Sequence, residues 1–162
     1  MLTLAGCFGY HVGNQSLYAP DVQTVSLQMF GSDSFRRGLG EWLTEAVGKE
    51  IEDRTPYKIA RSTEADSTIS GRLLAETKRG TVETINDDLR ELDVALYVQF
   101  EWRKHDGELI RQGQPIPLCG ILRDTYAHNA LVPEVGQTMV TAQQRAIEQL
   151  AQQIVDQMEA PW

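Results

Sequence analysis

The sequence LDVALYVQFEWR, residues 92–103, contains the longest alternation of apolar and polar side chains in the chain. Successive side chains of a β-strand point to opposite faces, so this stretch predicts a long strand with one buried face. A strand of this length should be central in its sheet or overhang it. The predicted buried positions are Leu92, Val94, Leu96, Val98, Phe100 and Trp102, and the polar side carries Asp93, Gln99, Glu101 and Arg103.

A turn signal follows this stretch. Asp106-Gly107 is typical of a two-residue type I′ turn between extended segments. Residues 108–112 are therefore predicted to return antiparallel to the long strand.

The segment before the long strand predicts a helix between parallel strands. Val25, Leu27 and Met29 alternate with polar residues and indicate a first strand, and residues 57–60 indicate a second. Residues 31–34 (GSDS) supply capping groups for a helix that Thr55-Pro56 ends. Its expected apolar stripe is Phe35, Leu39, Trp42, Leu43, Ala46, Val47 and Ile51. In a third strand, Ile69, Gly71, Leu73 and Ala75 should face one way, and Ser70, Arg72 and Glu76 the other.

The C-terminal third predicts a strand with a long loop and then a helix. Residues 113–137 contain three prolines and three glycines, which interrupt regular structure. Thr141 and Gln144 have the spacing of a capping box. The helix that follows should bury Ile147, Leu150, Ala151, Ile154 and Met158.

The order of these elements predicts an α+β fold. We expect a two-layer sandwich, with one mixed, mostly antiparallel sheet of four to five strands and two helices on one face. The other face should be open to water or to a partner. This single domain should span residues 22–162.

The N-terminus resembles a bacterial lipobox. Leu4-Ala5-Gly6-Cys7 places small residues before a cysteine whose thiol can take up a diacylglyceryl group, so Cys7 is the predicted lipid attachment site. Only six residues precede Cys7, fewer than a secretory signal needs, so the chain looks truncated at its start. We interpret residues 1–7 as a residual signal peptide with its lipobox and residues 8–21 as an extended lead-in.

Charge and composition argue against several classes of function. The formal net charge of -8 disfavours a general nucleic-acid binder, because such proteins use a basic field. No apolar run approaches the length of a membrane-spanning helix, so membrane attachment would come from a lipid or a partner. The 162 residues are enough for a core without metal or disulfide, and we expect no cofactor and no metal.

Sequence motifs for catalysis are missing. The three histidines are scattered, and Asp124 with His128, in the long loop, is the closest acid and imidazole pair. No G-x-S-x-G, H-E-x-x-H, P-loop or C-x-x-C pattern occurs. We therefore expect a protein that is not an enzyme.

Several segments together resemble the LptE family of lipopolysaccharide-assembly lipoproteins, in its divergent branch. They are the lipobox, GY at 9–10, VQTV at 22–25, SFRRGL at 34–39, LTEAVGKEI at 43–51, RTPY at 54–57 and the final helix. The resemblance implies a lipoprotein anchored in the outer membrane and facing the periplasm. It also implies that the protein plugs and helps to assemble the LptD β-barrel, and that it contacts lipopolysaccharide.

A second interpretation is a periplasmic lipid- or ligand-binding lipoprotein unrelated to LptD. The apolar residues of the long loop would then line an enclosed pocket, whereas a barrel plug should have a closed core and interaction residues on its outside. These loop residues are Ile116, Leu118, Ile121, Leu122, Tyr126, Leu131 and Val132.

Lipid A phosphates would need Lys or Arg at their contact points. Exposed strands and helices also carry such residues as ordinary solvated charge. Arg72 and Arg103 are the strongest candidates, because both should lie on the polar side of strands. The full candidate set is Arg36, Arg37, Arg72, Lys78, Arg79, Arg103 and Lys104.

Overall fold

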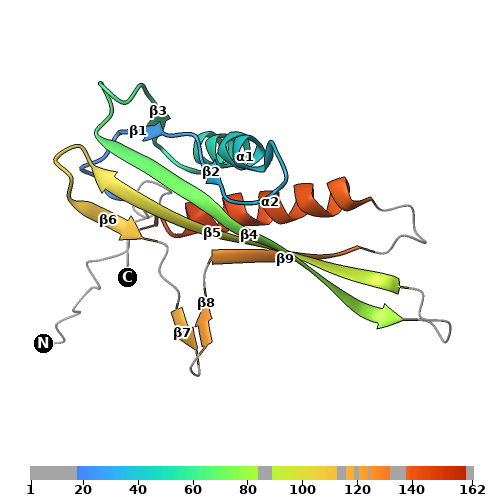
Figure 1. The fold of residues 1–162 in the computed structure, drawn as a ribbon. Coiled ribbons are helices and arrows are strands. Elements are labelled where there is room, and N and C mark those ends of the chain that lie inside the picture. Colours follow the sequence, from blue (N-terminus) through green and yellow to red (C-terminus); the bar gives the residue numbers. More distant parts are fainter. Residues whose placement is uncertain are drawn as a thin grey trace, which may run out of the picture.

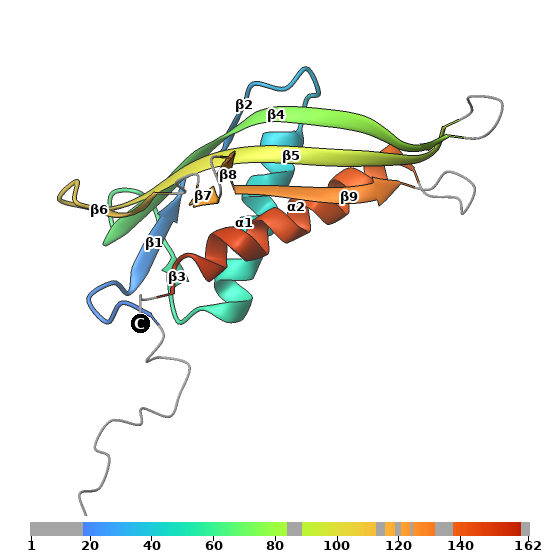
Figure 2. The ribbon, with the colours of Figure 1, turned by 90° about the horizontal axis from the view of Figure 1, so that it is seen from below.

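The computed structural model describes residues 18–83, 89–112, 116–118, 121–123, 125–131 and 138–159. In chain order the strands and helices are β1 (Thr24–Leu27), β2 (Gly31–Ser32), α1 (Leu39–Arg54), β3 (Lys58–Ile59), β4 (Ser67–Glu83), β5 (Leu89–Lys104), β6 (Leu109–Gln112), β7 (Ile116–Leu118), β8 (Ile121–Arg123), β9 (Thr125–Leu131) and α2 (Met139–Asp156). Both helices lie on one face of the main sheet (Figures 1 and 2). The predicted α+β two-layer sandwich is confirmed.

The main sheet has seven strands, more than the four to five expected. The strand order is β3-β1-β4-β5-β6. In addition, β2 pairs with β4 and β9 pairs with β5. The predicted parallel pairing of the first two strands is confirmed in β1 and β3, and β1 and β2 are also parallel to β4. The long β4–β5 pair is antiparallel and runs beyond α1 (Figure 1). β7 and β8 form a separate two-stranded sheet.

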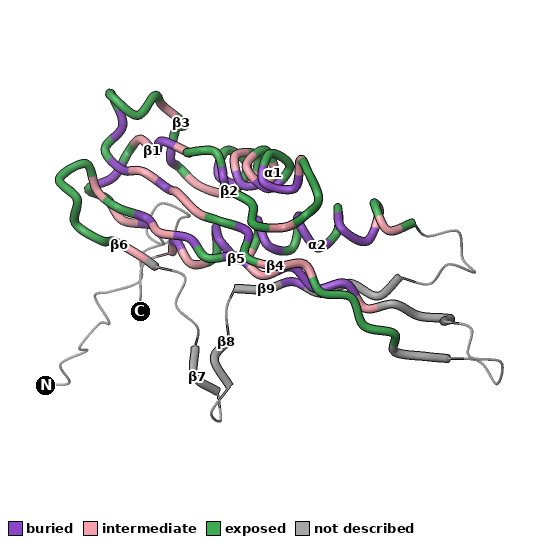
Figure 3. The backbone as a smooth tube through the Cα atoms, in the orientation of Figure 1, coloured by how far each residue is buried: buried purple, intermediate pink, exposed green. Residues whose placement is uncertain are grey.

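The alternation at residues 92–103 is confirmed as the inner face of β5. Val94, Leu96, Val98, Phe100 and Trp102 are all buried, and β5 is central between β4 and the β6 and β9 strands. Figure 3 marks buried positions along β5 and along both helices. The apolar area that these side chains remove from water is a large part of the driving force for folding.

The β5–β6 hairpin is confirmed, but its loop is longer than a type I′ turn. Lys104 N–H donates to the Glu108 carbonyl at 2.8 Å, and Gly107 N–H donates to the Lys104 carbonyl at 2.9 Å. Three residues therefore lie in the loop, and Gly107 has a φ of 89°. A three-residue loop closed by a left-handed glycine is the next most common hairpin connection.

A β-bulge between Leu73 and Ala75 changes which side chains of β4 face the helices. Leu73 lies opposite Val98, whereas after the bulge Glu76 lies opposite Leu96. Val98 and Leu96 are both buried under the helices, so Glu76 points to that side as well. The prediction that Ala75 faces the core and Glu76 faces water is therefore wrong.

Helix α1 begins later than predicted. Its first residue is Leu39, after Gly38 with a φ of 87°, and Phe35 lies before the helix, fully exposed. Leu39, Leu43, Val47 and Ile51 are buried at a spacing of four residues. Trp42 lies beside this row and is 43% exposed, so its expected place in the core is wrong.

Two further sequence predictions need correction. Met29 lies outside β1 and is 69% exposed, while Ser26 is buried, so β1 does not bury one alternating face. The cap of α2 is Thr138, whose Oγ1 accepts from the Thr141 N–H at 3.3 Å. The expected apolar face of this helix is confirmed, because Ile147, Leu150, Ala151, Ile154 and Met158 are all buried.

The long loop predicted at residues 113–137 contains more strand than expected. The whole of β9 pairs antiparallel with β5. His128 lies opposite Ala95, so it is in a strand and not in a loop. Asp124 and Cys119 lie outside the described residues. β7 and β8 have three residues each, too few to show a period of two, and the residues of β9 (TYAHNAL) do not alternate between apolar and polar.

Candidate functional site

The sheet face away from the helices carries two of the predicted basic residues. Arg72 on β4 and Arg103 on β5 share this face, because Thr68, four residues before Arg72, lies opposite Arg103. The structure therefore places the two strongest candidates on one open surface, as predicted.

Each of these two arginines is paired with a nearby carboxylate. Arg72 Nη1 lies 3.0 Å from Asp33 Oδ1, and the Arg72 side chain is 62% exposed. Arg103 donates to Glu101 Oε2 from Nε at 2.9 Å and from Nη2 at 2.8 Å. Exposed ion pairs of this kind contribute at most about 1 kcal/mol, so a phosphate could compete for either guanidinium.

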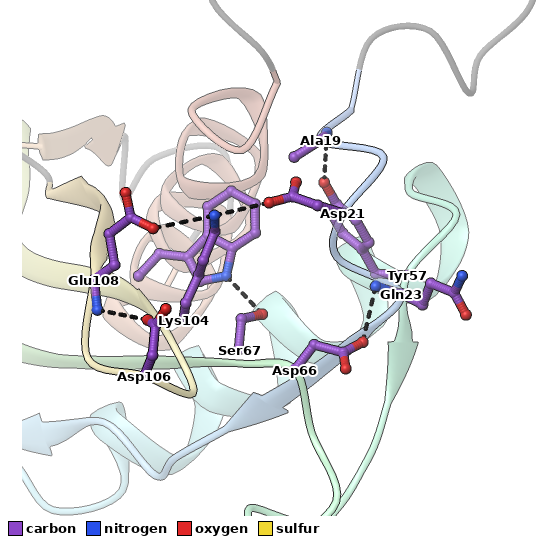
Figure 4. Close-up of polar contacts among 10 residues, drawn as sticks. Ala19, Asp21, Gln23, Tyr57, Asp66, Ser67, Lys104, Asp106 and Glu108 are labelled. Atoms are coloured by element: carbon purple, nitrogen blue, oxygen red, sulfur yellow. Dashed lines mark hydrogen bonds and ion pairs between the residues drawn. The ribbon is translucent and has the colours of Figure 1, made fainter.

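Lys104 lies on the other side of the strand from Arg103 and binds two acids (Figure 4). Its Nζ is 2.8 Å from Asp21 Oδ2 and 3.1 Å from Glu108 Oε2. The bond from Lys104 lowers the pKa of Asp21, and the bonds to Asp21 and Glu108 raise the pKa of Lys104. Lys104 thus connects Asp21, at the end of the lead-in, to Glu108 of the β5–β6 hairpin.

The end of the lead-in is also packed against the helices. Tyr18 is buried, and its hydroxyl donates to the Arg54 carbonyl at 3.1 Å. The Ala19 N–H donates to the Tyr57 hydroxyl at 3.0 Å, as Figure 4 shows. Burial raises the pKa of Tyr57 to about 12. Residues 1–17, with the predicted lipid site Cys7, lie outside the described residues.

Arg36 takes part in a polar network that the sequence did not indicate. Arg36 Nη1 donates to Gln143 Oε1, and Gln143 Nε2 donates to Glu76 Oε1, both at 2.5 Å. Gln143 is fully buried in α2, and Glu76 reaches it because of the bulge in β4. Lys78 Nζ lies 3.6 Å from Glu76 Oε1. Lys78 therefore pairs with the carboxylate of Glu76, and Arg36 is linked to that carboxylate through Gln143.

The predicted basic clusters are separated in the structure. Neighbouring residues of a strand point to opposite faces, which divides Lys78 from Arg79 and Arg103 from Lys104. Arg37 and Arg79 are exposed, and neither has an ion pair among the described residues. The seven candidates thus occupy several surfaces and do not form one site.

The helical layer carries a groove of its own, of about 670 Å³, between α1 and α2. Charged side chains line it together with apolar ones, so it is not the enclosed apolar pocket expected of a lipid binder. The side chains proposed for such a pocket, Ile116, Leu118, Ile121, Leu122, Tyr126, Leu131 and Val132, lie outside the described part of the structure.

Two kinds of feature are absent from the described residues. Neither helix is long and apolar enough to cross a bilayer. Within the same residues, no group of three His, Cys, Asp or Glu side chains is placed to hold a metal ion.

The fold and its surfaces define a class of protein, a small two-layer α+β module with a buried apolar core and charged outer faces. More specifically, the chain belongs to the LptE family: residues 22–159 match the family model described as lipopolysaccharide-assembly. This is a family of non-enzymatic envelope lipoproteins, and the resemblance noted in the sequence is confirmed. A search of curated proteins found no match.

Solved structures with the same fold include other lipoproteins. Lipoprotein B from Nitrosomonas europaea has a TM-score of 0.62 at 14% identity, covering 94% of this chain and 91% of that one. A minor lipoprotein from Acinetobacter baumannii has a TM-score of 0.50 at 19% identity, with 86% and 98% covered. The PelC dodecamer from Paraburkholderia phytofirmans has a TM-score of 0.51 at 12% identity, with 88% and 93% covered. At these identities the likeness concerns the fold alone.

Proposed function

We propose that this protein is an outer-membrane lipoprotein that plugs and helps to assemble an LptD-like β-barrel. The observation that supports this best is the combination of a buried apolar core with charged outer faces. The lumen of a large outer-membrane barrel is polar, so a plug needs a polar exterior. The open sheet face, with Arg72, Arg103 and their paired acids, has this character.

A lipid on Cys7 would hold the domain at the membrane. Tyr18, where the chain joins the packed domain, is 11 residues after Cys7. Such a segment spans at most about 40 Å when fully extended. Two or more acyl chains give stable anchoring, so the domain would stay within that distance of the inner leaflet of the outer membrane.

Contact with lipopolysaccharide is the finer part of the proposal. Arg72 and Arg103 lie on one open face, and their exposed acid partners are weak competitors for a phosphate. Arg37 and Arg79 add two exposed guanidinium groups. Arg36, Lys78 and Lys104 are weaker candidates, because Arg36 and Lys78 contact the pair of Gln143 and Glu76 under α2 and Lys104 contacts two carboxylates.

The partner can be tested by co-purification. The chain would be expressed with its native export leader beside the LptD homologue of the same genome, extracted in mild detergent and captured through a C-terminal tag. Recovery of the barrel in near-equal amount is expected. With Cys7→Ala, the domain should leave the membrane fraction and still melt cooperatively. A tethered, folded protein that captures no barrel would contradict the plug proposal.

Lipopolysaccharide contact needs its own test. The double variant Arg72→Gln with Arg103→Gln should bind purified lipopolysaccharide more weakly than the unmodified chain. Arg61→Gln with Arg145→Gln is the matched control, because it removes the same charge from other exposed positions. Equal losses in both variants would show a general charge effect and remove this part of the proposal.

A further inference from the structure

The groove between α1 and α2 holds an exposed tryptophan over an apolar floor. Trp42 is 43% exposed, and Val140 in the first turn of α2 is 49% exposed. Between them the groove is lined by Ala46, Ile147 and Ala151. Exposed apolar side chains beside a groove can serve as contact points for a partner.

The indole of Trp42 has unused bonding capacity. Among the residues that the structure describes, its N–H has no acceptor. Trp102, by contrast, is buried and donates to Ser67 Oγ. A tryptophan whose N–H edge is exposed to solvent and whose ring face contacts apolar side chains is a common anchor in protein interfaces.

The rim of the groove is acidic. Glu45 and Glu50 of α1 and Glu148 of α2 line it with one cation, Lys49, which gives a formal charge of -2. Glu50 also lies 3.7 Å from Arg54 Nη1, and Glu148 accepts from Gln144 Nε2 at 3.2 Å. This rim repels phosphates and anionic lipids and attracts Lys or Arg.

We infer that this groove docks a segment of a protein partner in which an aliphatic or aromatic side chain is flanked by Lys or Arg. The apolar side chain lies on the floor beside Trp42, and the flanking cations meet Glu45 and Glu148. An arginine over the indole face adds a cation–π contact. The volume of about 670 Å³ is within the range of sites that hold a compact ligand.

This inference does not depend on the barrel or on lipopolysaccharide. Both helices lie on one face of the sheet (Figure 2). The groove lies between them, whereas Arg72 and Arg103 lie on the opposite face of the sheet. The two surfaces also differ in the sign of the charge that they would select. One domain can therefore bind a basic segment through its helices while its sheet face contacts a different ligand.

The test uses the purified, unacylated full chain and two dye-labelled peptide probes of equal length. The Lys probe alternates blocks of Lys and Leu, and the Glu probe has Glu in place of each Lys. Fluorescence anisotropy should show binding of the Lys probe, weakened by salt, and much weaker binding of the Glu probe. Trp42→Ala should weaken binding of the Lys probe about tenfold. The double variant Glu45→Gln with Glu148→Gln should also weaken it about tenfold, as the loss of two exposed ion pairs implies.

Matched controls make the result decisive. Leu109→Ala removes an apolar side chain that is 42% exposed on β6, and Glu52→Gln with Glu64→Gln removes two exposed carboxylates away from the groove. Both should leave binding unchanged, and circular dichroism confirms that each variant is folded. Equal binding of the two probes, or equal effects of groove and control variants, would overturn the inference. So would a dimer that Trp42→Ala dissociates.

Discussion

Trp102 Nε1 donates a hydrogen bond to Ser67 Oγ at 3.0 Å, and both residues are buried. Trp102 lies near the end of β5 and Ser67 begins β4, so this bond joins the two longest strands where they meet the rest of the sheet. The indole also contacts the Tyr57 ring, with centroids 5.7 Å apart. A buried polar pair therefore fixes the orientation of the largest side chain in the core.

Ser67→Ala should destabilise the domain by about 1–3 kcal/mol, because it leaves a buried indole N–H without an acceptor. Urea denaturation followed by far-ultraviolet circular dichroism measures the change. Ser70→Ala, on the open face of the same strand, is the matched control and should change stability by less than about 0.5 kcal/mol. Similar effects of the two substitutions would mean that the hydrogen bond does not contribute.

Two neighbouring residues of α1 should respond very differently to truncation. Leu43 is fully buried, and Leu43→Ala should cost about 2–5 kcal/mol. Trp42 is 43% exposed, so Trp42→Ala should cost clearly less than Leu43→Ala, although the indole is the larger side chain. Thermal or urea unfolding of both variants gives the comparison. A larger loss for Trp42→Ala would show that the indole is part of the core after all.

The case of Trp42 shows what helical periodicity can and cannot predict. The pattern identified the helix and most of its buried face, because residues four apart share a face. A tryptophan at the border of the apolar stripe can turn inward or outward, and only packing against α2 decides. Strand β5 was predicted more fully, since a period of two over twelve residues leaves one register that buries the apolar side.

The candidate site was harder to predict, because strands and bulges redistribute neighbouring charges. The sequence pairs Lys78 with Arg79 and Arg103 with Lys104, but each pair is split between two faces. The bulge after Leu73 turns Glu76 under α2, where Gln143 and Arg36 meet it. The local sequence contains no pattern that predicts this bulge. The open-face placement of Arg72 was predictable, because no bulge precedes it in β4. That of Arg103 was predictable, because the alternation of β5 buries Val94, Leu96, Val98, Phe100 and Trp102 and leaves Arg103 on the other side.

The glycines of α1 offer a test of close packing. A Cβ on Gly40 would lie 2.3 Å from the Phe30 carbonyl oxygen, a contact that backbone must move to relieve. Gly40→Ala should therefore destabilise the domain by about 1–3 kcal/mol in spite of the better helix propensity of alanine. Gly48→Ala is the control, since its Cβ would be 3.4 Å from a flexible Leu27 methyl. It should be neutral or stabilise by up to about 1 kcal/mol in chemical denaturation.

Asp66 should give the domain part of its sensitivity to acid. Its carboxylate accepts hydrogen bonds from Thr24 Oγ1 at 2.8 Å, Thr24 N–H at 2.9 Å and Gln23 N–H at 3.0 Å (Figure 4 shows the bond from Gln23). The bond from the Thr24 hydroxyl, followed by those from the two amides, lowers the pKa of Asp66 below its ordinary value of 3.8. A carboxyl with a lowered pKa stabilises the fold above that ordinary value, and this contribution is lost as the pH falls through the lowered pKa.

Asp66→Asn should therefore lower the melting temperature at about pH 6, and the difference from the unmodified chain should shrink as the pH falls to about 2.5. The reason is that protonation removes from the unmodified chain the same charge that the substitution has already removed. Melting temperatures across this range provide the measurement. Asp53→Asn, at an exposed position of α1, is the control and should keep a constant, small difference. If the Asp66→Asn difference stays constant over the same range, the loss at neutral pH comes from altered packing of the amide and not from the charge.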